Sequence, residues 1–210
     1  MHQNMMQAIA YKCLLDTTFD NSLHDDLDGT KAAAAYNIVH RSLIDAMIMA
    51  LMRIWDPTGQ DRLSLGNLFV KYLGNHDFVD YCVARASITW VGPRQSRIKN
   101  AVDCYYNAVI SYDETNKKIK KIKQVRDRTL AHSLNQEAPK TTYVELFDLI
   151  SDTEEIVNDL HVFVTGTSIG YDYVQEDFNG TCKQFWSFLA ESAKKHKVTR
   201  RNRLKQLDPV

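Results

Sequence analysis

The sequence predicts an all-α fold. Long segments repeat apolar residues at helical spacing, and no segment alternates apolar and polar residues for long enough to predict a sheet. The chain has only four prolines and eight glycines in 210 residues, and these cluster at breaks between the periodic segments. The length fits one domain with a substantial hydrophobic core. We therefore expect a single helical domain over residues 1–195 and a basic, mobile tail over residues 196–210.

The N-terminal part of the chain predicts two long helices. The first is expected over about residues 3–15, and the second over about residues 30–55. The tetrapeptide Asp-Pro-Thr-Gly at residues 56–59 is a strong stop signal for the second helix. Because residues 43–55 are apolar on nearly every side, we expect this part of the helix to be central and buried.

The middle of the chain predicts shorter helices and then a long one. Ser64 can cap a helix that ends near residue 73, and Asp77 can cap another that ends near residue 89. The Gly-Pro pair at residues 92–93 marks the next break. Either one long helix or a pair of helices divided near Asp113 is expected over residues 94–132.

Two further helices are predicted at the C-terminal end. Thr141 or Thr142 can cap the first of them, with Glu145 in its first turn and Gly166 at its end. The last helix is expected over about residues 174–195.

Charge is unevenly distributed along the chain. The formal net charge is zero, so the whole chain is not a polycation that would coat nucleic acid indiscriminately. Residues 117–128 and 194–205 are rich in lysine and arginine, whereas residues 145–159 are rich in acidic side chains. The acidic helix at residues 142–165 can pack antiparallel against the basic stretch with complementary faces. This interpretation limits how far the lysines alone indicate RNA binding.

The sequence also indicates where in the cell the protein resides and which cofactors it lacks. The N-terminus lacks a basic start followed by an apolar stretch, so no signal peptide is expected, and the longest apolar run, at residues 46–52, is too short to cross a bilayer. The four cysteines are scattered and are interpreted as reduced thiols of a cytoplasmic protein with no membrane partner. No metal-ligand motif and no glycine-rich phosphate loop occurs, so we expect no metal and no cofactor.

Arg126 occupies an unusual place in the long helix. On a helical wheel, Ile119, Ile122, Leu130 and Ser133 lie on one side, and Arg126 lies among them. The neighbouring lysines, which include Lys120 and Lys123, are expected to point elsewhere. A charge on an apolar stripe must be paired, or must face an interface or a cleft.

One structural explanation is an internal ion pair. Asp45 on the second helix can pair with Arg41 one turn away, or it can reach Arg126.

His132 is the second group suited to chemistry. A histidine near an apolar face at a helix C-terminus is often structural, but together with Arg126 it offers a proton carrier and a phosphate ligand. RNA cleavage by internal attack needs a base for the 2′-hydroxyl, stabilisation of an anionic phosphorus centre, and a proton for the leaving oxygen. One arginine and one histidine supply the first two. The second proton donor would come most simply from the same motif of another subunit.

An arginine, an adjacent polar residue and a histidine after four to six intervening positions resemble the signature of the HEPN superfamily. Here Arg126 and His132 have five residues between them, and Asp127 fills the polar slot. The segments Arg-Ile-Trp-Asp at residues 53–56 and Leu-Ser-Leu-Gly-Asn-Leu at residues 63–68 are similar to the abortive-infection, AbiU-type branch. The resemblance covers roughly residues 30–165.

This resemblance implies an up-and-down helical bundle with additional helices, which forms a homodimer with the site at the subunit interface. It implies a metal-independent endoribonuclease, acting in phage defence or as a toxin with an antitoxin protein as a partner. Arg126 would stabilise the scissile phosphate, Asp127 would orient the arginine or the RNA, and His132 would move the proton. Arg128 does not fit the spacing of the family pattern, but it lies closer to His132 on the helical wheel and is expected to share the phosphate role. Lys123 and Lys120 are also expected to contact RNA.

Two other interpretations remain open from the sequence. One is a non-enzymatic HEPN module that binds RNA, a nucleotide or a partner protein. The other is a helical interaction protein in which Arg126 is purely structural.

Overall fold

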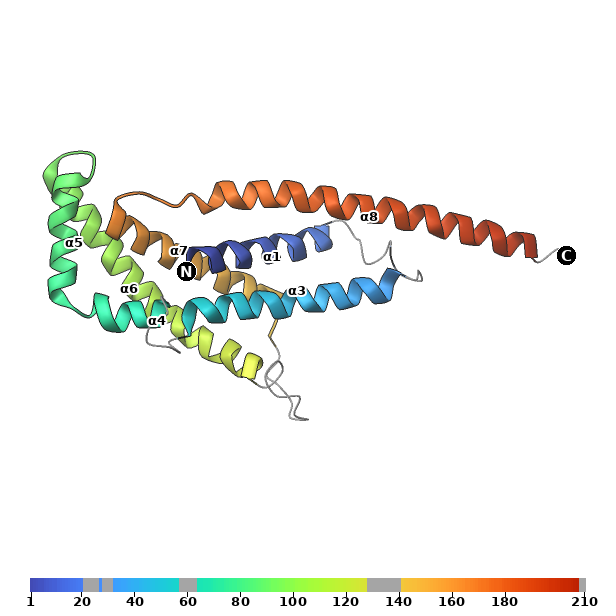
Figure 1. Cartoon of the computed structure of the whole chain (residues 1–210), viewed down its shortest axis with the longest axis horizontal. Helices are drawn as coiled ribbons and strands as arrows, with labels where there is room; N and C mark the ends of the chain where they lie inside the picture. The colour runs from blue at the N-terminus through green and yellow to red at the C-terminus, as the bar shows by residue number, and fades with distance from the viewer. Residues whose placement is uncertain (21–26, 28–31, 57–63, 128–140, 208–210) are drawn as a thin grey trace. The chain divides into compact units, whose positions relative to one another are not determined.

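All regular structure in the described part of the chain is helical, which confirms the all-α prediction. The computed structural model describes residues 1–20, 27, 32–56, 64–127 and 141–207 (Figure 1). The elements, in chain order, are α1 (His2–Asp20), α3 (Ala32–Trp55), α4 (Leu65–Leu68), the π-helical turn η1 (Phe69–Leu73), α5 (His76–Thr89), α6 (Arg94–Val125), α7 (Tyr143–Thr165) and α8 (Tyr171–Leu207).

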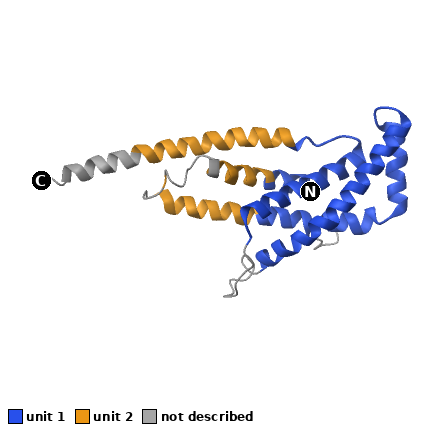
Figure 2. Cartoon of the chain, turned by 180° about the vertical axis from the view of Figure 1, so that it is seen from behind, with its two compact units in different colours: residues 1–8, 48–171 blue, residues 9–47, 172–210 orange. Residues whose placement is uncertain are grey.

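The chain forms two compact units. Unit 1 consists of residues 1–8 and 48–171, and unit 2 consists of residues 9–47 and 172–210 (Figure 2). The single domain at residues 1–195 and the mobile tail at residues 196–210 stay predictions.

In unit 1, helices α6 and α7 pack against each other in antiparallel directions. Lys118 pairs with Asp152, and Lys121 pairs with Glu145. The later residue of α6 therefore meets the earlier residue of α7, as in an antiparallel pair of helices. The predicted charge complementarity is therefore confirmed. These pairs are exposed and contribute little stability individually. Burial of one apolar face of α7 is the larger contribution, and its members are Leu146, Leu149, Ile150, Ile156, Val157, Leu160 and Phe163.

The end of α3 is buried in unit 1, as its apolar sequence predicts. The indole N–H of Trp55 donates to Oγ1 of Thr153 on α7 at 3.0 Å, and this hydroxyl donates to the Leu149 carbonyl at 2.6 Å. Tyr112 of α6 stacks with Trp55 at 5.2 Å and with Phe69 of η1 at 3.8 Å between ring centroids. These contacts fix the last turn of α3, and therefore the position of the next residue, Asp56.

Two helix starts and one helix end follow the predicted signals. The side chain of Ser64 accepts a hydrogen bond from the backbone N–H of Asn67 at the start of α4. Thr142 and Glu145 form a reciprocal capping box at the start of α7. Gly166 ends α7 with a φ of 81°, a left-handed conformation that favours glycine.

Two details of the predicted helices are wrong, and one open alternative is resolved. Asn75, not Asp77, caps α5, because its Oδ1 accepts from the Asp77 backbone N–H and leaves Asp77 in the first turn. Of the two alternatives for the long segment, one continuous helix is confirmed as far as Val125, because α6 continues through Asp113, which is exposed and does not interrupt packing. α8 does not end at residue 195 but continues to Leu207, since no glycine or proline occurs between residue 195 and Pro209.

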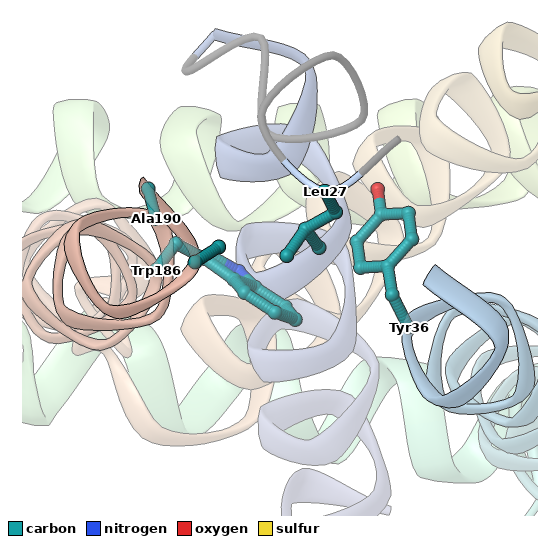
Figure 3. Close-up of a cluster of buried hydrophobic side chains, with 5 residues drawn as sticks. Leu27, Tyr36, Trp186 and Ala190 are labelled. Carbon is teal, nitrogen blue, oxygen red and sulfur yellow. The ribbon is translucent and has the colours of Figure 1, made fainter. Parts of the chain in front are cut away.

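Unit 2 has its own apolar cluster, formed by Leu27, Tyr36 and one face of α8 (Figure 3). Trp186 is 2% exposed and meets the ring of Tyr36 edge-on at 6.0 Å between centroids. Its indole N–H donates to the Leu14 carbonyl at 2.9 Å, which satisfies the one polar atom of the side chain.

Candidate functional site

Arg126 lies at the C-terminal end of α6, on the same side of the helix as two core residues. Ile119 and Ile122 are buried, with 6% and 2% exposure, and Arg126 follows one turn later. Its side chain is only 17% exposed. The prediction that Arg126 continues an apolar stripe is therefore confirmed as far as the described residues extend, and the charge requires a partner.

That partner is Asp56, the residue that follows α3. Arg126 Nη1 donates to Asp56 Oδ2 at 2.6 Å, and the Asp56 side chain is only 13% exposed. Burial raises the pKa of Asp56, but the hydrogen bond from Arg126 and the charges of Lys123 and Arg126 outweigh burial and hold the pKa below its ordinary value. Asp56 is therefore ionised at neutral pH. The predicted alternative partner, Asp45, has the charge of Arg41 beside it.

Asp127 holds the other edge of the same guanidinium. Its Oδ1 accepts a hydrogen bond from Arg126 Nε at 2.8 Å and lies 2.6 Å from Nη2. Burial lowers the pKa of Arg126, and the hydrogen bonds to Asp56 and Asp127 more than reverse this, so the guanidinium stays charged. Hydrogen bonds to described residues engage its Nε and Nη1, and Nη2 lies within ion-pair distance of Asp127. Its remaining N–H groups bond to no other described residue.

The lysines around Arg126 fall into two groups. Lys118 and Lys121 are paired with acidic residues of α7. Lys123 Nζ lies 3.5 Å from Asp56 Oδ1, so Lys123 and Arg126 share one carboxylate. The expectation that Lys123 points away from Arg126 is therefore wrong, because three residues along a helix bring two side chains to neighbouring positions. Lys120 is exposed and borders a cavity that Asp56 and Lys123 also line.

This cavity of about 300 Å³ is formed by α3, α4, η1 and α6. Asp56 and Lys123 stand at its side nearest Arg126, and Trp55 and Tyr112 form part of its apolar wall. Sequence reasoning did not identify Asp56, Tyr112 or Asn116 as site residues. The sequence identifies Asp56 as part of a helix stop and of the segment that resembles the AbiU-type branch, and helical periodicity carries no information about which helices become neighbours.

His132 and Arg128 lie outside the described residues. Their positions relative to Arg126 therefore stay predictions, as do their roles.

The helical fold and the position of the Arg126-Asp127 pair at the end of a long helix fit the HEPN class of proteins. The chain belongs to the HEPN AbiU2 family, whose model matches residues 1–185. The predicted resemblance over residues 30–165 is confirmed and extends further at both ends. No curated protein and no solved structure gave a match.

None of the helices in the described part of the chain combines the length and the apolar character needed to cross a bilayer.

Proposed function

We propose that this chain is a metal-independent endoribonuclease of the HEPN type, which acts in the cytoplasm in phage defence or as a toxin. The observation that supports this proposal best is the state of Arg126. It is a charged, largely buried guanidinium held at two edges by Asp56 and Asp127, and its remaining N–H groups bond to no other described residue. A guanidinium held in this way is preorganised for a phosphate, because little side-chain entropy remains to be lost on binding.

The proposed reaction is internal attack on the RNA backbone. The 2′-oxygen attacks phosphorus, the bond from phosphorus to the 5′-oxygen breaks, and the products carry a 2′,3′-cyclic phosphate and a 5′-hydroxyl. Arg126 stabilises the negative charge on the phosphoryl oxygens, and Asp127 keeps the guanidinium in position. His132 takes the proton of the 2′-hydroxyl, and His132 of a second copy gives a proton to the 5′-oxygen. This division of roles requires a homodimer with the site at its interface.

Arg128, Lys120 and Lys123 are proposed to contact neighbouring phosphates of the RNA. Of the two described lysines, Lys120 is the more available, because Lys123 is already in contact with Asp56. If the protein acts as a toxin, its partner is an antitoxin protein.

A non-enzymatic HEPN module that binds RNA, a nucleotide or a partner protein is the second candidate. It is favoured by the same ion pairs, since Asp56 and Asp127 together can neutralise both Arg126 and Lys123. In this candidate Arg126 stabilises the fold and binds no scissile phosphate.

The test is cleavage of total RNA in EDTA by the wild type and by the Arg126→Ala, Arg126→Lys and His132→Ala variants. The proposal expects cleavage by the wild type and loss in the alanine variants, with Arg126→Lys strongly reduced because lysine lacks the planar fork. Lys118→Ala is the matched control, since it removes a cation from the same helix that is paired with Asp152. Equal cleavage by all folded variants would refute the assignment of Arg126 and His132 to the cleavage reaction. Circular dichroism melts establish that each variant is folded.

A further inference from the structure

The cavity beside Arg126 combines an apolar wall with polar groups gathered at one side. Its lining includes Met52, Trp55, Val70, Tyr112 and Ile119 as apolar or aromatic members. Its volume of about 300 Å³ is sufficient for one flat heteroaromatic ring system. A cavity of this composition suits a ligand that is apolar over its faces and polar at its edge.

The carboxylate of Asp56 connects this cavity to the arginine. Its Oδ2 accepts from Arg126, whereas its Oδ1 is buried and accepts no hydrogen bond from any described residue. Lys123 Nζ lies 3.5 Å from this oxygen, which is longer than a well-formed hydrogen bond. A buried carboxylate oxygen without a donor is costly, so a ligand that supplies an N–H group would gain from meeting it.

Two more polar groups of the cavity have unused capacity. Asn116 is half-buried, and its amide makes no hydrogen bond to any described residue. Lys120 forms no ion pair with a described residue, in contrast to Lys118 and Lys121, which are paired with α7. Asn116, Lys120 and Lys123 lie at helical spacing along one face of α6. The cavity therefore offers an acceptor, an amide and a cation.

We propose that this cavity binds a nucleobase that carries an exocyclic amino group, and that this base belongs to the nucleotide next to the phosphate held by Arg126. This inference rests on the proposed RNA-directed function. Adenine fits the free groups most completely. One amino hydrogen and the ring N7 pair with the Asn116 amide, and the other amino hydrogen donates to Asp56 Oδ1. Lys120 then meets a phosphate of the same nucleotide.

Asp56 would link base recognition to the arginine. A base bound at Oδ1 and the guanidinium bound at Oδ2 are held by one carboxylate, so the flanking base sets where Arg126 meets the RNA backbone. The geometry assigns to Asp56 a positioning and specificity role, and the chemistry of cleavage stays with the arginine and the histidine.

The test is binding of mononucleotides to the full-length protein, followed by nuclear magnetic resonance of the Asn116 side-chain amide. Adenosine monophosphate is compared with purine riboside monophosphate, which differs only by the missing amino group. We expect adenosine monophosphate to shift the Asn116 amide and to bind about 10-fold more tightly than its analogue, as loss of a hydrogen bond to a charged acceptor implies. Uridine monophosphate should also bind more weakly.

Variants complete the test. Val70→Trp should block the cavity without unfolding the protein, because Val70 is 80% exposed. Asn116→Ala should weaken the binding of adenosine monophosphate and reduce its preference over the analogue, while the amino hydrogen that donates to Asp56 Oδ1 keeps part of that preference. Lys118→Ala is the control and should change neither.

The inference is overturned if the two nucleotides bind equally, if neither binds at millimolar concentration, or if Val70→Trp leaves binding unchanged. These outcomes are separate from the fate of the proposed function. RNA cleavage by the wild type without nucleotide binding would refute only the base site, whereas nucleotide binding without cleavage would refute only the nuclease.

Discussion

The ion pair between Arg126 and Asp56 should be strongly coupled in a double-mutant cycle. Arg126→Ala, Asp56→Ala and the double variant are compared with the wild type by urea unfolding followed with circular dichroism. The two side chains are 17% and 13% exposed, and their closest atoms are 2.6 Å apart. A hydrogen bond between charged and largely buried groups is worth about 1.5–3 kcal/mol. We expect the coupling free energy to lie near the lower end of that range.

The lower end is expected because each residue keeps a second partner in the single variants. Without Asp56, Arg126 keeps both bonds to Asp127. Without Arg126, Asp56 keeps Lys123 at 3.5 Å. These remaining contacts reduce the penalty of leaving one charge unpaired.

The pair Lys118–Asp152 is the matched control for this cycle. It joins α6 to another helix in the same unit, but its side chains are 55% and 30% exposed. Exposed pairs couple by about 0.2–1 kcal/mol. A coupling for Arg126 and Asp56 no larger than that of the control would refute the claim that Asp56 fixes the guanidinium. The comparison requires that the slope of the unfolding free energy against urea concentration is the same in all variants.

Three further predictions concern stability. Gly166→Ala should destabilise the protein by about 1–3 kcal/mol in urea unfolding, because an added Cβ would lie 2.6 Å from Trp90 and the backbone has a φ of 81°. Gly180→Ala in α8 should instead stabilise the protein by about 0.5–1 kcal/mol, because its Cβ would meet nothing within 4 Å. The reverse order of stability would contradict the packing described for Gly166. Thr142→Ala should cost about 1 kcal/mol in the same assay through loss of the capping box, and a neutral result would show that α7 does not depend on its cap. Because the pKa of Asp56 in the folded protein lies below 3.8, its contribution to stability is present above that pH and is lost as the pH falls through the folded pKa. In thermal melts below about pH 4, Asp56→Asn should therefore lose less stability than the wild type. Parallel curves of stability against pH for the two proteins would contradict an ionised Asp56.

Local signals in the sequence were sufficient for most of the helices. Ser64, Thr142 and Gly166 act through groups within a few residues of themselves, so their effect can be predicted without a fold. The end of α8 was misjudged because a basic composition was given more weight than the absence of a helix breaker before Pro209. A run of basic residues does not by itself end a helix.

The candidate site was predicted only in part, for a physical reason. The apolar stripe on α6 identified Arg126 as a charge that needs a partner, because periodicity reports which side of a helix faces the core. It could not identify Asp56, which lies 70 positions away in sequence and meets Arg126 only through the packing of α3 and α6. The same limit concealed the cavity, whose lining comes from four separate elements.

The most direct test of the proposed metal-independent cleavage is the chemistry of the RNA ends that the protein leaves in EDTA. A 5′-labelled and a 3′-labelled RNA are incubated with the wild type and with folded Arg126→Ala, and the new ends are identified by their response to phosphatase, acid and kinase. Internal attack by the 2′-oxygen predicts 2′,3′-cyclic phosphate and 5′-hydroxyl ends from the wild type and no new ends from Arg126→Ala. Intact RNA with the wild type, 3′-hydroxyl and 5′-phosphate ends, or the same cyclic ends from Arg126→Ala would each contradict it.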